Sequence, residues 1–221
     1  MVEEKMNREI NKTIWEKLYG NGRNVLTYPN EVLVTLASRM LDSKTQVRLL
    51  DYGFGSGNNM MHFLKRGFEV SGVEISEQAL ELSKKRAQDC GYEVELRLLS
   101  DGTIPFSDNS FDIVVAWQVL CYNDWNTLRL AVNEIERVLK PGGVFLGTMT
   151  DLGDISHIES VEIGDHLYRS QVKGQDGAIR IIVNKDDLQR CFPKRKLEIG
   201  KFGHEFQGIS GKHWIVSYRN E

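Results

Sequence analysis

One glycine-rich stretch, residues 49–59, constrains the fold of this chain more than any other part of it. Its sequence is Leu-Leu-Asp-Tyr-Gly-Phe-Gly-Ser-Gly-Asn-Asn. It continues an apolar run that begins at Val47, and residues 60–65 after it have the pattern of a helix. A strand, a glycine loop and a helix in this order bring backbone amides close to a bound ligand. The stretch therefore predicts an α/β domain with a ligand site at the carboxyl end of its first strand.

The spacing of the glycines separates this loop from a dinucleotide-binding loop. Gly53, Gly55 and Gly57 alternate with other residues, whereas the pattern Gly-x-Gly-x-x-Gly would place a glycine at Asn58. Asp51 precedes the loop, and its carboxylate would repel a pyrophosphate but attract an ammonium group. With these residues in place, the stretch resembles motif I of the class I S-adenosylmethionine-dependent methyltransferases, whose cofactor carries an ammonium group and no phosphate.

Two further acids stand at the ends of the next two predicted strands. Glu74 closes the second strand, where a carboxylate can accept hydrogen bonds from both ribose hydroxyls. Ile75 follows it, and an apolar side chain there would pack on the adenine face. Asp101 and Gly102 follow the third strand, and the resemblance implies that they bind the adenine ring. The three acids would thus bind S-adenosylmethionine and its product, S-adenosylhomocysteine.

The fourth predicted strand, residues 111–117, is nearly all apolar and therefore central. Ligands of open parallel sheets bind outside the carboxyl ends of the strands. Trp117 and Gln118 leave the strand at that end, so we expect them beside the methionine part of the cofactor. Tyr122, a few residues later, is expected to reach the substrate.

The resemblance covers roughly residues 45–150 well and residues 185–221 only in outline. It implies a Rossmann-like sheet of seven mostly parallel strands, with helices on both faces and an antiparallel C-terminal edge strand. Residues 1–44 are predicted to be a helical leader before the methyltransferase domain of residues 45–221. Alternating apolar residues around a Gly-Gln-Asp-Gly turn predict a β-hairpin inserted at about residues 158–184.

The leader is a candidate lid. In methyltransferases of this kind, helices before the core often close over cofactor and substrate, so Tyr19 and Tyr28 are candidate cofactor contacts. The alternative is that these aromatic rings only pack the leader helices on the domain. The sequence leaves both possibilities open.

Methyl transfer from a sulfonium is an in-line displacement, so the protein mainly positions the nucleophile and excludes water. A general base is needed only when the nucleophile arrives protonated. His157, Tyr122 and His204 are the candidate catalytic residues, and His157 is the best placed because it follows the fifth strand.

The composition of the chain limits the classes of molecule that we expect it to bind. The net charge of −3 and the isoelectric point near 6.0 give no basic footprint for nucleic acid, and no apolar run is long enough for a membrane span. Three scattered cysteines fit a reducing cytoplasm and predict no metal site. We therefore expect a cytoplasmic monomer or homodimer that methylates a small molecule at oxygen, nitrogen or carbon.

Two alternative functions make different demands on the sequence. A non-catalytic S-adenosylmethionine-binding domain, acting as a sensor or partner subunit, would keep the same three acids. An NAD-dependent short dehydrogenase would need the dinucleotide glycine spacing and a Tyr-x-x-x-Lys pair, and no tyrosine of the chain has a lysine four residues later. The sequence rules against the dehydrogenase, and it identifies neither the acceptor nor the methylated atom.

Overall fold

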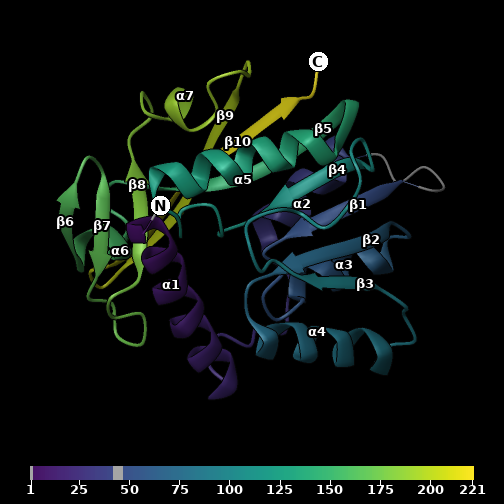
Figure 1. Ribbon diagram of the computed structural model, residues 1–221, viewed down its shortest axis with the longest axis horizontal. Helices are drawn as coiled ribbons and strands as arrows, with labels where there is room; N and C mark the ends of the chain where they lie inside the picture. The colour runs from purple at the N-terminus through teal and green to yellow at the C-terminus, as the bar shows by residue number, and fades with distance from the viewer. Residues whose placement is uncertain (1, 42–46) are drawn as a thin grey trace.

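The computed structural model describes residues 2–41 and 47–221, which form a three-layer α/β fold (Figure 1). Among these residues, no helix has both the length and the apolar character needed to cross a lipid bilayer. The helices are α1 (Val2–Gly20), α2 (Glu31–Met40), α3 (Asn58–Lys65), α4 (Glu77–Asp89), α5 (Trp125–Val138), α6 (Ile155–Ile158) and α7 (Leu188–Cys191). The strands are β1 (Arg48–Tyr52), β2 (Glu69–Glu74), β3 (Glu95–Leu98), β4 (Phe111–Ala116), β5 (Leu139–Asp151), β6 (Ser160–Gly164), β7 (Leu167–Ser170), β8 (Ile179–Val183), β9 (Glu198–Phe206) and β10 (Ile209–Arg219).

Seven strands form the predicted Rossmann-like sheet. Strands β3, β2, β1, β4 and β5 are adjacent in that order and parallel. β10 pairs antiparallel with β5, and β9 pairs antiparallel with β10. The predicted fold class is therefore confirmed, with the antiparallel strand placed between β5 and β9.

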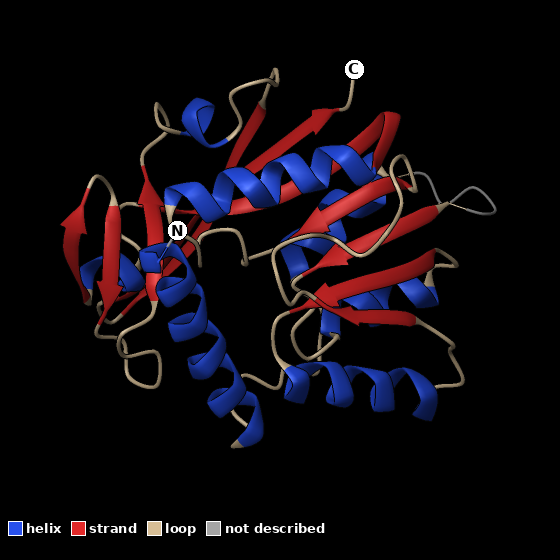
Figure 2. Ribbon diagram, viewed as in Figure 1, coloured by secondary structure: helices blue, strands red, loops and turns tan. Residues whose placement is uncertain are grey.

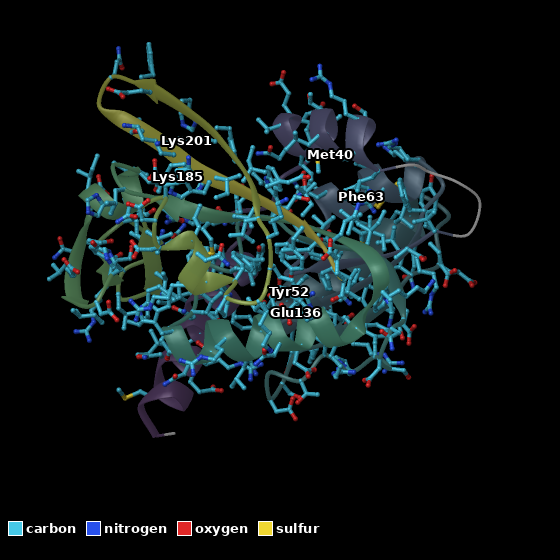
Figure 3. The ribbon with its side chains drawn as sticks, turned by 90° about the horizontal axis from the view of Figure 1, so that it is seen from above. Met40, Tyr52, Phe63, Glu136, Lys185 and Lys201 are labelled. Carbon is cyan, nitrogen blue, oxygen red and sulfur yellow. The ribbon has the colours of Figure 1, made fainter. Side chains whose placement is uncertain are left out.

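Helices cover both faces of this sheet, as Figures 2 and 3 show. Alternate residues of β1 enter different cores: Leu50 packs in the cluster that contains α5, and Leu49 packs in the cluster that contains α2 and α3. In Figure 3, Met40 of α2 and Phe63 of α3 lie on one side of the sheet, and Glu136 of α5 lies on the other. Both faces of the central strands are buried, which explains their continuous apolar runs.

Polar side chains cap the starts of two helices. The Asn30 side chain accepts hydrogen bonds from the amides of Val32 and Leu33 and caps α2. Ser76 caps α4 by accepting from the Ala79 amide. These caps satisfy amides that have no partner within the helix. The Ser76 cap also fixes where the chain leaves the carboxyl end of β2.

The segment between β5 and α7 extends the sheet beyond the end of β4. β4 pairs with β5 as far as Gly147, and β8 then pairs in parallel with Thr150 and Asp151. β7 and β6 follow by antiparallel pairing, on the left of Figure 1. β6 has no counterpart among the predicted strands, because most of its side chains are exposed. The insert forms a wall at the carboxyl edge of the sheet.

The leader contributes two helices. α1 packs against α4, α5 and β8, and Figure 1 shows it running from the insert toward α4. α2 packs on the core through Leu33 and Ala37. The predicted boundary between leader and domain, at residues 44 and 45, lies outside the described residues and stays a prediction.

Candidate functional site

A cavity of ≈ 130 Å³ lies at the carboxyl ends of β1, β2 and β4. The strands are neighbours in the sheet, so their ends meet at one edge. α1 forms one wall of the cavity, and the start of α5 forms another. The lining residues are Arg8, Asn11, Trp15, Tyr19, Tyr52, Gly53, Val73, Glu74, Ile75, Leu99, Asp101, Gly102, Gln118, Val119, Tyr122, Asn123, Thr127, Leu130 and Ala131.

Glu74 joins the glycine loop to the turn after β2. One carboxylate oxygen accepts from the Gly55 amide at 2.9 Å, and the other accepts from the Ile75 amide at 2.7 Å and the Ser76 amide at 3.2 Å. Burial raises the pKa of this carboxyl group, and the three amides oppose that shift. The side chain is thus fixed in one orientation on the cavity wall.

Two positions of the glycine loop require glycine, because the backbone there is left-handed and a neighbouring side chain lies close to it. Gly53 has φ +73°, and a Cβ atom there would lie 2.3 Å from Val119 Cγ2. Gly55 has φ +54°, and its Cβ would lie 2.5 Å from the Tyr19 hydroxyl oxygen. Left-handed backbone disfavours other residues, and both clashes would move a cavity wall. The loop therefore lets Val119 and Tyr19 approach the backbone closely.

Asp51 lies behind the cavity, next to the lining residues Tyr52 and Gly53. It is 2% exposed, and its Oδ2 atom has no hydrogen-bond partner. Burial and the nearby Glu74 raise its pKa to about 7. An unpartnered buried carboxylate oxygen fits a ligand that donates a positively charged N–H group.

This raised pKa makes stability depend on pH. The folded chain keeps the Asp51 proton up to about pH 7, whereas an ordinary aspartate releases it near 3.8. The stabilisation is therefore complete below the lower pKa and is lost as pH rises through the upper one. We expect the ligand-free wild type to lose about 2 kcal/mol more than Asp51→Asn between pH 5 and pH 7.5. Urea unfolding of both proteins at both pH values measures this difference, and parallel losses would contradict the Asp51 assignment.

α1 forms the roof of the cavity through polar contacts. Asn11 Nδ2 donates to the carbonyl oxygens of Tyr122 and Ile179, and the Ile179 amide donates back to Asn11 Oδ1 at 2.8 Å. Glu16 accepts hydrogen bonds from the Ser76 hydroxyl and the Gln78 amide. The ring of Trp15 meets the edge of Tyr122 with centroids 4.9 Å apart. The helix is thus attached to the insert and to both sides of the cavity.

The residues after β4 divide between core and cavity. Trp117 does not line the cavity: it is 5% exposed and stacks on Phe202, with ring centroids 5.5 Å apart, in the core on the other face. Gln118 lines the cavity, has φ +55°, and its amide donates to Thr148 Oγ1. Tyr122 also lines the cavity, and its hydroxyl donates to Gln175 at 3.2 Å. Both residues follow the end of β4 at Ala116, and the left-handed backbone of Gln118 separates its direction from that of Trp117.

Three other predicted site residues lie apart from the cavity. Tyr28 is 82% exposed. His157 accepts from the Gly153 amide at 3.0 Å and packs against Tyr168. His204 is exposed and lies opposite Gly211 on the β9–β10 hairpin. These placements do not support the roles predicted for them.

Gly57 is also placed next to the site without lining the cavity. It has φ +74° and begins α3. Asp101 and Gly102 do line the cavity, and Asp101 accepts from the Thr103 amide at 2.9 Å. That bond holds the pKa of Asp101 below its usual value.

Sequence reasoning missed His213 and Arg180. His213 Nε2 lies 2.9 Å from Nε2 of the cavity residue Gln118, and burial lowers the pKa of the imidazole. Arg180 is 3% exposed, and its guanidinium lies over the Tyr122 ring at 4.6 Å. His213 reaches the site because β10 is antiparallel, so its first half lies at the carboxyl end of β5. One feature of the sequence could have identified Arg180 as a site residue: its charged side chain stands between apolar residues of a predicted strand.

Comparison with known proteins places the central residues in a family. Residues 50–147 match the family model described as a methyltransferase domain. The chain is 31% identical over 112 residues to the uncharacterized methyltransferase YcgJ of Bacillus subtilis, covering 50% of this chain and 44% of that protein. It is 30% identical over 107 residues to the demethylmenaquinone methyltransferase of Tropheryma whipplei, covering 48% and 43%. The chain spans about half the length of the curated relatives it matches.

Solved structures extend the likeness in fold to nearly the whole chain. The 1,6-didemethyltoxoflavin-N1-methyltransferase of Burkholderia thailandensis, solved with 1,6-didemethyltoxoflavin and S-adenosylhomocysteine bound, has a TM-score of 0.73 and 15% identity. The match covers 98% of this chain and 89% of that one. The family match includes the glycine loop, Glu74 and Asp101, which are the residues that carry the resemblance in sequence. Residues 50–147 thus match a methyltransferase domain, and the fold of the chain is that of solved S-adenosylmethionine-dependent methyltransferases.

Proposed function

We propose that this protein transfers a methyl group from S-adenosylmethionine to a small-molecule acceptor at oxygen, nitrogen or carbon. The convergence of Asp51, Glu74 and Asp101 at the ends of three adjacent strands carries this proposal. Glu74 and Asp101 line the cavity, and Asp51 directly precedes the lining residues Tyr52 and Gly53 in the chain. Three acids in this order offer acceptors for an ammonium group, a ribose and an adenine, and no site for a pyrophosphate.

The acceptor atom is not fixed by the family. A relative from Erwinia pyrifoliae, 28% identical over 151 residues, is a malonyl-[acyl-carrier protein] O-methyltransferase. Others are named as sterol C-methyltransferases, and the Burkholderia enzyme as an N-methyltransferase. We therefore propose the small-molecule class without choosing among the three atoms. A non-catalytic sensor is less well supported, because the matched relatives with named activities are methyltransferases.

The chain's own residues would position the reactants. When bound, S-adenosylmethionine supplies the methyl group and the leaving group, so the protein needs no nucleophile of its own. We propose that Glu74 holds the ribose, Asp101 with Gly102 the adenine, and Ile75 the ring face. Gln118 and Tyr19 would contact the methionine part, next to the glycine loop. α1 would exclude water from the reacting centre.

Tyr122 remains the proposed contact to the acceptor. Burial raises its pKa to about 12, so the phenol stays protonated at neutral pH and acts as a hydrogen-bond donor. For an acceptor that arrives protonated, we propose His213 as the base in place of His157. Its lowered pKa keeps the imidazole neutral, and Gln118 connects it to the cavity.

Calorimetry tests the proposed function. We expect S-adenosylmethionine and S-adenosylhomocysteine to bind with micromolar affinity, about −8 kcal/mol, and NAD to give no heat beyond dilution. The glycine spacing and the acids are the reason for this preference. Tight NAD binding, or no binding of the first two compounds, would refute the proposal.

A further inference from the structure

Arg180 is a buried cation with no carboxylate at ion-pair distance among the side chains that the structure describes, those of residues 6–41 and 47–221. It is 3% exposed, and its Nε atom has no hydrogen-bond partner. Burying an unpaired charge costs several kcal/mol, so a fold retains one mainly where something binds to it.

The nearby carboxylates are engaged elsewhere. Asp151 pairs with Lys201. Asp154 accepts from the Lys212 amide at 2.8 Å and from Ser156. Neither is available to neutralise the Arg180 guanidinium at hydrogen-bond distance. Within the described part of the chain, the Arg180 guanidinium therefore has no direct ion-pair partner.

One side-chain oxygen accepts a hydrogen bond from the Arg180 guanidinium. Gln175 Oε1 accepts a hydrogen bond from Arg180 Nη2, and it also accepts one from the Tyr122 hydroxyl at 3.2 Å. Tyr122 in turn lines the cavity, and the Arg180 guanidinium lies over the Tyr122 ring. Gln175 belongs to the half-buried loop between β7 and β8, whose Gly174 and Gly177 have φ +88° and +85°. A neutral amide oxygen thus receives two donors, one of them charged, that would bind an anionic oxygen more strongly.

We propose that Arg180 and the Tyr122 hydroxyl bind a carboxylate of the methyl acceptor, and that the Gln175 amide oxygen occupies this position until the acceptor enters. The proposal rests on the proposed function in naming the acceptor as a carboxylic acid. The free Nε beside Nη2 offers two parallel donors, which match the two oxygens of a carboxylate. One guanidinium and one hydroxyl provide too few donors for a phosphate dianion.

Two substitutions at Gln175 have opposite expected effects. Gln175→Ala removes the competing oxygen and should tighten acetate binding about three- to tenfold, the range of one hydrogen bond. Gln175→Glu places a carboxylate on Arg180 within the chain and should abolish acetate binding through its high effective concentration. Both variants leave Arg180 and Tyr122 in place. A purely structural role for Arg180 predicts no change in acetate binding for either variant.

The measurement uses the full chain labelled with ¹⁵N-arginine, titrated with acetate, acetamide or inorganic phosphate. The Arg180 Nε–Hε signal is assigned by its disappearance in Arg180→Lys. We expect acetate to shift it saturably, acetamide to leave it in place, and Tyr122→Phe to weaken the acetate response. Arg169→Lys, which changes an exposed arginine on β7, is the control and should not alter the response.

The outcomes are distinct. No saturable acetate shift, an equal shift with acetamide, or unchanged binding in the Gln175 variants would overturn the site. Tighter binding of phosphate than of acetate would overturn its assignment to a carboxylate. Wild-type protein that binds S-adenosylhomocysteine by calorimetry but not acetate refutes this inference alone, whereas the reverse result refutes the proposed methyl transfer and leaves the carboxylate site standing.

Discussion

Replacing Glu74 with alanine is expected to weaken S-adenosylmethionine binding about 100-fold, or roughly 2.7 kcal/mol. The carboxylate is fixed by the amides of Gly55, Ile75 and Ser76 and lies on the cavity wall. Its loss removes the acceptor proposed for two ribose hydroxyls, and a charged hydrogen bond is worth more than a neutral one. Isothermal calorimetry at several cofactor concentrations measures the change.

Two further variants separate binding from folding. Glu74→Gln keeps an acceptor oxygen for the amides but removes the charge, and it should fall between wild type and Glu74→Ala. Glu77→Ala removes an exposed acid from the first turn of α4 and should leave affinity unchanged. Equal affinities for wild type and Glu74→Ala would remove the proposed ribose role.

Asn11→Ala is expected to destabilise the protein by about 3 kcal/mol and to release α1 from the insert. The Asn11 side chain is 2% exposed and makes three hydrogen bonds to the backbone of Tyr122 and Ile179. Alanine would leave those buried backbone groups unsatisfied. Urea unfolding gives the stability, and hydrogen exchange of the α1 amides reports how far the helix opens.

The roof of the cavity gives this variant a functional readout. Several α1 residues line the cavity, so opening of this helix is expected to affect how quickly a ligand enters and leaves. Asn11→Ala should therefore speed both association and release of S-adenosylhomocysteine. Thr13→Ala, an exposed position that bonds only to Glu9, is the control. Unchanged exchange in α1 would show that Asn11 does not hold it closed.

The sequence predicted the fold well where local chemistry and tertiary contacts agree. Alternating glycines and an acid at each strand end are local patterns, and they placed β1, β2 and β3 in order. Buried apolar runs identified β4 and the strand that follows α5. The antiparallel C-terminal edge was expected from the family resemblance, and the pairing of β10 with β5 and β9 confirms it.

The sequence predicted the site less well where the role of a residue depends on whether its side chain faces the cavity or the core. Trp117 and Gln118 are neighbours, yet only Gln118 lines the cavity, and the register that decides this comes from pairing with β5. Tyr19 lines the cavity and Tyr28 is exposed, although both are aromatic residues of the leader. Arg180 and His213 meet Tyr122 and Gln118 through contacts between residues far apart in sequence. Such contacts leave no local periodicity.

The parallel pairing of β8 with the end of β5 has a consequence for how such enzymes diverge. Thr150 pairs with Ile182 and Asp151 with Val183, so the chain leaves and rejoins the core at adjacent points, about 4.8 Å apart across the sheet. The segment between these points therefore has ends fixed by the core sheet. Insertions or deletions in its β6–β7 part would change the wall of the site, whereas changes at Ile179 would also alter α1 through Asn11.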